Sequence, residues 1–292
     1  MRTRFELTPY LLILPALLTL LLLFVYPIAW NGWLSVHNVT FGTFTQEWPF
    51  VGADNYLAVL RDTIFPRRFV DSLWVTLKFV GGSVIGQFLL GLALAMGLNS
   101  RIRGRNAFRM LIALPWILSE LVVAYIWLYM YQPSGTVNNV LGLFGVDTVR
   151  WLGNTSIAIW ALVFTNVWFG TPFTMLTLGS ALTTINPQLH EAATVDGATS
   201  WQKFRFITWP LILPFVALNL ILITMWTINL FALPLAMTNG GPLYATTTTS
   251  LYMYRHAFEF GNFSIGSSIG VMLFVFNLVA AAVYVRMLRS SD

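Results

Sequence analysis

One carboxylate stands alone in a long apolar part of the sequence. Between Met110 and Val146 the only charged residue is Glu120. A carboxylate at membrane depth is costly and usually faces a water-filled cavity or a polar partner. Three roles remain open for Glu120: binding hydroxyl groups of a small molecule, pairing with a basic residue of another subunit, or staying protonated and packing.

Few other side chains could carry catalysis or hold a cofactor. The sequence has no cysteine, which excludes disulfide bonds, thiol nucleophiles and cysteine metal sites. His37, His190 and His256 fall in or near expected loops, which disfavours a redox subunit with haem or metal at membrane depth. Neither Lys78 nor Lys203 follows a Gly-rich phosphate-binding pattern, so no nucleotide site of that kind is expected. We therefore expect no catalytic residue, metal or cofactor on this chain.

A polar stretch at residues 191–214 is the second place where chemistry is expected. It reads EAATVDGATSWQKFRFITWPLILP and separates two long apolar runs. The Asn-Pro pair at 186–187 is a favourable helix start. Gly197 can adopt the left-handed conformation that ends this helix, and Thr199 or Ser200 can cap another. The sequence thus predicts a helix, a sharp turn and a second helix.

The composition of this stretch suits a protein partner. Ala192 and Ala193 keep one face flat, and Glu191 and Asp196 offer charge-assisted contacts. An ordinary amphipathic loop on a membrane surface is the alternative, and the residues alone leave both open.

Membrane helices must position these residues. The chain is 57% hydrophobic and 9% charged, whereas soluble domains carry about 25% charged residues. Gly82, Gly86 and Gly91 would allow close helix packing in lipid. A spanning helix needs about 20 mostly apolar residues. The apolar runs predict an all-α polytopic membrane protein, with one transmembrane domain over residues 1–292 and six spanning helices at 9–31, 72–98, 109–131, 156–183, 209–235 and 264–286.

The basic residues of the loops indicate the orientation. The side with both termini, the loop at 99–108 and the polar stretch carries about twice as many Lys and Arg residues as the other side. Because that excess marks cytoplasmic loops, both termini and the polar stretch are expected in the cytoplasm. The net charge of +5 then reflects topology, and no nucleic acid partner is expected. Residues 8–30 are expected to be an uncleaved first helix rather than a signal peptide.

The polar stretch resembles the EAA motif of permease subunits of ATP-binding-cassette (ABC) importers, EAA-x3-G-x9-I-x-L-P. The matching residues are Glu191, Ala192, Ala193, Gly197, Ile207 and Pro210, with Trp209 in place of Leu. Asp196 and Ala198 extend the match to the DGA form common in carbohydrate permeases. Other patterns along the chain are similar to this family: Leu114-Pro115, Trp168-x-Gly170-x-Pro172 and Asn239-Gly240-Gly241-Pro242.

The resemblance implies a type I ABC-importer permease fold and a transport role in the cell inner membrane. Residues 186–208 would form a coupling loop, and the residues that dock on the ATPase would be Glu191, Ala192, Ala193, Asp196 and Gly197. Two copies of a separate ATPase subunit would hold ATP and Mg. The other implied partners are a second, different permease subunit, which would make a heterodimer, and an extracytoplasmic substrate-binding protein. The cargo would be an oligosaccharide or a related polyol, carried by alternating access.

The resemblance to the maltose-importer type of permease also implies a substrate path. The matching positions are Trp116, Glu120, Phe169, Gly170, Phe173, Ile223, Trp226, Thr227 and Leu230. Aromatic faces would cover the C–H surfaces of a sugar, while Glu120, Thr227 and the backbone near Gly170 would pair with its hydroxyl groups. Simple helix packing is the alternative for the aromatic residues.

Two other transport functions remain open. One is an ATP-independent secondary transporter with Glu120 as proton carrier, a class that usually shows internal repeats and broken helices at the membrane midplane. The other is an ABC permease for glycerol-phosphate-type cargo, against which the absence of basic residues from the expected path argues. The sequence does not name the sugar.

Overall fold

The computed structural model describes residues 8–63, 68–99 and 103–289, which are helical apart from turns and isolated β-bridges. Among these described residues, five helices are long and apolar enough to span a membrane, or six if one bent pair counts as a span. The predicted all-α polytopic class is confirmed. Arg2, Arg4 and Arg101, on which the predicted orientation partly rests, lie outside the described residues, so the orientation stays a prediction.

The chain divides into two compact units, the first made of residues 1–69 and 253–274 and the second of residues 70–252 and 275–292. The described elements of the first unit are α1 (Thr8–Leu20), η1 (Leu21–Val25), α2 (Tyr26–Ser35), η2 (Phe41–Thr43), α3 (Asp54–Leu60), η4 (Arg255–Glu259) and the first part of α14 (Phe263–Arg289).

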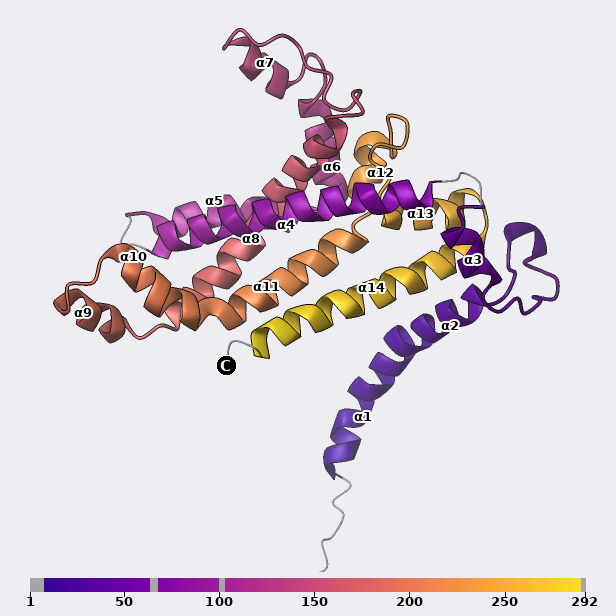
Figure 1. The fold of residues 1–292 in the computed structure, drawn as a ribbon, viewed down its shortest axis with the longest axis horizontal. Helices are drawn as coiled ribbons and strands as arrows, with labels where there is room; N and C mark the ends of the chain where they lie inside the picture. The colour runs from indigo at the N-terminus through magenta and orange to yellow at the C-terminus, as the bar shows by residue number, and fades with distance from the viewer. Residues whose placement is uncertain (1–7, 64–67, 100–102, 290–292) are drawn as a thin grey trace, which may run out of the picture. The chain divides into compact units, whose positions relative to one another are not determined.

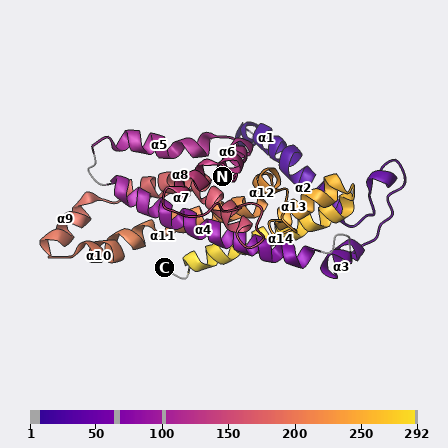
Figure 2. The same ribbon diagram turned by 90° about the horizontal axis from the view of Figure 1, so that it is seen from above.

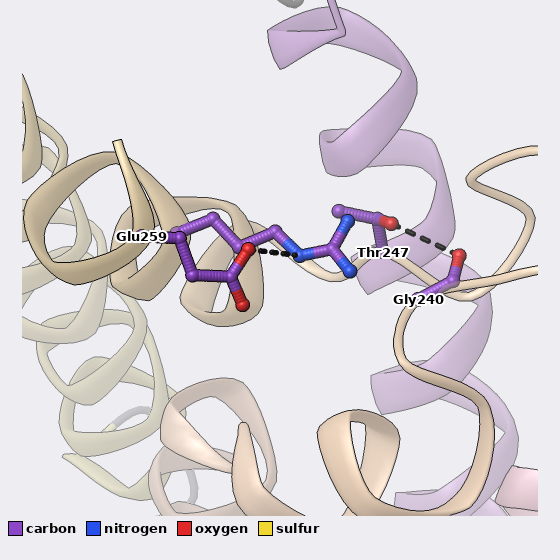
Figure 3. Close-up of polar contacts among 4 residues, drawn as sticks. Gly240, Thr247 and Glu259 are labelled. Atoms are coloured by element: carbon purple, nitrogen blue, oxygen red, sulfur yellow. Dashed lines mark hydrogen bonds and ion pairs between the residues drawn. The ribbon is translucent and has the colours of Figure 1, made fainter.

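In the first unit, α1, η1 and α2 form one apolar span from Leu11 to Ser35. The π-helical turn of η1 comes just before Pro27, which has no amide hydrogen to continue the α-helical ladder. The most apolar part of this span buries no residue inside the structure, so its environment is membrane or another subunit. In η4, Arg255 Nε lies 3.4 Å from Glu259 Oε2 (Figure 3).

The second unit is built around α8 (Ala158–Thr183), whose apolar window is 67% buried. It packs against α5 and α11 and lies between them (Figure 2). The other helices of this unit are α4 (Phe69–Asn99), α5 (Arg105–Ile117), α6 (Glu120–Met130), α7 (Thr136–Gly142), α9 (Pro187–Val195), α10 (Ser200–Lys203), α11 (Trp209–Asn229), α12 (Ala232–Thr238) and α13 (Thr249–Tyr254), with π-helical η3 (Phe204–Thr208) between α10 and α11.

Helix α4 lies directly on α8, and glycines make this possible (Figure 1). A Cβ atom placed on Gly86 would stand 2.5 Å from Val167 Cγ2, and one on Gly91 would stand 2.5 Å from Thr174 Cβ. At Gly82 the nearest atom, in Val163, would be 3.0 Å away. The close helix packing predicted for these glycines is confirmed.

The prediction of one continuous helix at 109–131 is wrong. Helices α5 and α6 meet at an angle of 97°, with the backbone of Leu118 and Ser119 extended. Pro115 weakens the end of α5 because it cannot donate a backbone hydrogen bond. Ser119 is the N-cap of α6, although its side chain makes no capping bond.

The predicted helix at 209–235 is also divided. Helix α11 ends at Asn229, Leu230 is extended with ψ at 110°, and α12 begins at Ala232. In an unbroken helix Pro234 could not donate to the Leu230 carbonyl, and its ring would clash with that carbonyl. The break removes the clash, and Ser250 Oγ donates to the Leu230 carbonyl at 3.0 Å.

The contact between α4 and α8 can be tested with two matched substitutions. Gly86→Ala should lower the unfolding temperature of the purified transporter because its Cβ would collide with Val167, an overpacking that costs about 1–3 kcal/mol. Gly81→Ala is the control, because no heavy atom lies within 4 Å of a Cβ there, and it should be neutral or stabilising. Equal unfolding temperatures for the two variants would contradict this packing.

Candidate functional site

The polar stretch folds as a helix, a sharp turn and a short helix, as predicted. Asn186 caps α9, and its side chain accepts a hydrogen bond from the Gln188 amide at 3.0 Å. Gly197 follows with a φ of +78°, which side chains rarely tolerate. Thr199 and Gln202 then form a reciprocal capping box at the start of α10.

A hydrogen bond across the turn joins the two helices. Lys203 Nζ on α10 donates to Thr194 Oγ1 on α9 at 2.8 Å. Glu191 and Asp196 are exposed and form no ion pair within the described residues. The turn is therefore ordered by its own contacts, and its acidic side chains remain available.

The residues expected on the substrate path mostly surround one small cavity in the second unit. Four helices contribute to it: α4, α5, α8 and α11. Its lining consists of Gln87, Trp116, Asn166, Phe169, Gly170, Phe173, Ile223, Trp226 and Thr227. The structure therefore brings together all of the expected residues except Glu120 and Leu230.

Aromatic side chains narrow the cavity. The ring centroids of Trp116 and Phe173 are 5.6 Å apart, and Trp226 lies 6.4 Å from both Phe169 and Phe173. The remaining open space is about 20 Å³, the room needed by about one water molecule. A space of this size does not hold a sugar ring.

Two amide side chains in this lining were missed by the sequence analysis. Gln87 Nε2 donates to the backbone carbonyl of Asn166 at 3.2 Å. The Asn166 side chain donates in turn to Thr227 Oγ1 at 3.5 Å. These contacts form a polar line from α4 through α8 to α11. The sequence signal that could have identified Gln87 and Asn166 is an amide side chain within an otherwise apolar run, because polar groups at membrane depth often mark a substrate pathway.

Glu120 and Leu230 lie at the two helix breaks and do not line the cavity. Glu120 Oε1 accepts a hydrogen bond from the Leu233 amide at 2.8 Å. That amide belongs to the first turn of α12, where a carboxylate is favoured by both hydrogen bonding and the helix dipole. Leu230 is buried in the apolar core with Leu233. The observed partner of Glu120 is thus a helix end of the same chain.

The Asn-Gly-Gly-Pro segment forms a turn, as expected. Asn239 and Gly240 adopt left-handed backbone conformations with φ of 47° and 72°. Thr247 Oγ1 donates to the Gly240 carbonyl at 3.0 Å (Figure 3), and Thr246 Oγ1 donates to the Gly241 carbonyl at 2.7 Å. The buried threonines after the turn therefore hold its shape.

Comparisons with known proteins agree with this architecture. The family described as "Binding-protein-dependent transport system inner membrane component" matches residues 87–290. The chain is 38% identical over 281 residues to the trehalose/maltose transport system permease protein MalF of Thermococcus litoralis, covering 96% of this chain and 93% of the relative. It is 30% identical over 285 residues to the sn-glycerol-3-phosphate transport system permease protein UgpA of Escherichia coli O157:H7, covering 97% and 94%.

A solved structure shows the same fold. In the crystal structure of a bacterial alginate ABC transporter in complex with an alginate pentasaccharide-bound periplasmic protein, one chain matches with a TM-score of 0.81. The two chains are 25% identical, and the match covers 97% of this chain and 94% of the other.

The family match and the whole-length relatives agree with the apolar spans and set aside the secondary-transporter alternative. The chain belongs to the family of binding-protein-dependent transport system inner membrane components, the multi-pass permease subunits of ABC importers.

Proposed function

We propose that this permease carries a carbohydrate, an oligosaccharide or a related polyol, through the cavity between α4, α5, α8 and α11. The chemistry of the residues that line this cavity supports the proposal. Aromatic rings stand beside amide and hydroxyl groups, and no lining residue of that cavity is basic. Aromatic faces suit the C–H surfaces of a sugar, and the amides suit its hydroxyl groups. The relative MalF, a trehalose/maltose permease by name, supports the same class.

A glycerol-phosphate-type cargo is the second candidate, because the relative UgpA is a permease for sn-glycerol-3-phosphate by name. A phosphate is usually bound by Arg or Lys side chains or by a helix N-terminus. The uncharged lining of the cavity favours a neutral carbohydrate.

The energy would come from a separate ATPase subunit that docks on the coupling loop, residues 186–208. Glu191 and Asp196 would supply charged contacts, Ala192 and Ala193 a flat face, and Gly197 the turn. Glu191 also lines a cavity of about 470 Å³ beside α9, with room for a partner side chain.

Helical structure connects the coupling loop to the cargo cavity. From Ser200 to Asn229 the chain forms one span through α10, η3 and α11. Ile223, Trp226 and Thr227 at the far end of this span line the cavity. A displacement of the loop by the ATPase would therefore move one wall of the cavity. This coupling explains how alternating access could open a site that is closed here.

The complete importer would contain this chain as one transmembrane domain over residues 1–292, with both termini in the cytoplasm. Its partners would be a second, different permease subunit, two ATPase subunits that hold ATP and Mg, and an extracytoplasmic binding protein. The alginate transporter complex, with its periplasmic protein, supports the last of these partners.

Two variants test the docking proposal. Glu191→Lys should lower ATP-driven uptake at least tenfold and reduce retention of the ATPase subunit on the purified permease, because it reverses a contacting charge. Gly197→Val should do the same, because a β-branched residue is strained at positive φ by about 1–2 kcal/mol.

One control repeats the charge reversal at a distant exposed position, and the other is a conservative change at position 197. Glu47→Lys makes the same charge change at another exposed glutamate, and Gly197→Asn keeps a residue that tolerates positive φ. Both should retain uptake. Normal uptake and ATPase retention in Glu191→Lys and Gly197→Val would refute the docking assignment.

A separate prediction concerns Glu120 as a positioning residue for α12. Glu120→Leu should lower the unfolding temperature of the purified transporter because the Leu233 amide loses its acceptor, a loss of about 1–3 kcal/mol. Glu120→Gln retains an oxygen acceptor and should be close to the unaltered protein in stability. If Glu120 binds cargo instead, Glu120→Gln will change the half-saturating cargo concentration, and Glu120→Leu will unfold at the normal temperature.

A further inference from the structure

Gln87 and Gly170 fit together where α4 crosses α8. The three atoms nearest to a Cβ built on Gly170 would be Oε1, Cδ and Nε2 of Gln87, with Cδ at 2.5 Å and Nε2 at 2.8 Å. All three belong to one carboxamide group. Glycine at position 170 therefore leaves a slot in the surface of α8, and the Gln87 carboxamide occupies it.

The Gln87 side chain is buried, and among the described residues only its amide nitrogen has a hydrogen-bond partner. Gln87 is 3% exposed, and Nε2 donates to the Asn166 carbonyl at 3.2 Å. Among the described residues, Gln87 makes this one hydrogen bond, and no group donates a hydrogen bond to its Oε1 atom. An amide oxygen can accept two hydrogen bonds and the amide nitrogen can donate two. Hydrogen-bonding capacity therefore remains unused beside the cavity.

The surroundings of this amide are those that a sugar ring requires. Phe169 and Phe173 flank Gly170 on α8, and Trp226 contacts both rings from α11. Gln87 lies among the same lining residues. A carbohydrate held against these rings would present hydroxyl groups at its edge, and an amide can both donate to and accept from a hydroxyl group.

The carboxamide also fills space that a bound sugar would need. The open volume of about 20 Å³ is too small for a sugar ring while Gln87 occupies its slot. Exchange of the Asn166 carbonyl for a cargo hydroxyl would replace one hydrogen bond by another, so its net free energy is small. The amide nitrogen of Gln87 would therefore keep a hydrogen-bond partner when it leaves the slot for the cargo.

We propose that Gln87 is a cargo-binding residue that determines specificity, seated over Gly170 in the closed cavity and bonded to cargo hydroxyl groups when the cavity opens. This inference rests on the proposed carbohydrate function. Helix α4 then belongs to the substrate path as well. Because Gly170 has no side chain, it provides the space that the Gln87 carboxamide occupies before cargo enters.

The test uses the complete importer in proteoliposomes, with its second permease, ATPase and binding protein. Labelled maltose, trehalose and alginate oligosaccharides are offered first to the unaltered transporter. A carbohydrate that is carried is then compared with its monodeoxy analogues, each lacking one hydroxyl group. If none of the carbohydrates is carried while glycerol 3-phosphate is, the proposed function fails and this inference fails with it.

The informative variant is Gln87→Leu, which has a similar size and no amide. We expect its half-saturating concentration for the full sugar to rise about tenfold, because a hydrogen-bond partner of the cargo is lost. We also expect it to lose discrimination against one monodeoxy analogue. Ser83→Ala, a change at another buried polar residue of α4 outside this cavity, should leave that discrimination unchanged. A purely structural Gln87 would alter the uptake of sugar and analogues by the same factor, and that result would overturn the proposal.

A second experiment tests the contact between Gly170 and Gln87 by creating a collision there and then removing it. Gly170→Ala should lower both the unfolding temperature and the rate of uptake, because its Cβ would collide with the Gln87 carboxamide. Adding Gln87→Ala should restore the unfolding temperature but leave the half-saturating concentration raised. Full recovery of uptake in the double variant would show that Gln87 only fills space, and would overturn the proposal.

Discussion

A helix that breaks inside a bilayer releases backbone groups that have no water to bind. The described part of the chain has two such breaks, one at Leu118 and Ser119 and one at Leu230. At the second break, released polar groups are bonded inside the protein: Ser250 Oγ donates to the Leu230 carbonyl, and Glu120 Oε1 accepts from the Leu233 amide. A costly membrane carboxylate thereby serves as a hydrogen-bond acceptor for the first turn of α12.

The two breaks shape the region beside the cargo cavity. The segments after them, α6 and α12, pack on each other and on α8. The segments before them, α5 and α11, end near residues of the cavity lining, Trp116 and Trp226. Because α10, η3 and α11 form one span from Ser200 to Asn229, a movement of the proposed coupling loop would reach Trp226 through continuous helical structure. In the proposed transport cycle, the packed pair α6–α12 would be the rigid part and α11 would be the lever.

Local features of the structure could be predicted from the sequence more readily than long-range ones. The turn at Gly197 was predictable because its caps, Asn186 and Thr199, lie within a few residues of it. The spans followed from hydropathy, which reports how apolar a run is and is insensitive to a break within it. The breaks at Leu118 and Leu230 were therefore missed, although Pro115 and Pro234 lie next to them. The hydrogen-bond partner of Glu120 is 113 positions away in the sequence. The contact of Gln87 with Gly170 depends on the packing of α4 on α8. Neither contact could be predicted from a local sequence pattern.

In the proposed mechanism, transport through this chain is driven by an ATPase docked on the coupling loop. The most direct measurement is carbohydrate uptake into proteoliposomes that contain both permeases and a loaded binding protein, with and without the ATPase subunit, ATP and an imposed proton gradient. Under this mechanism we expect uptake only with the ATPase and ATP, and no effect of a protonophore. Uptake that is driven by the proton gradient in the absence of the ATPase would contradict it.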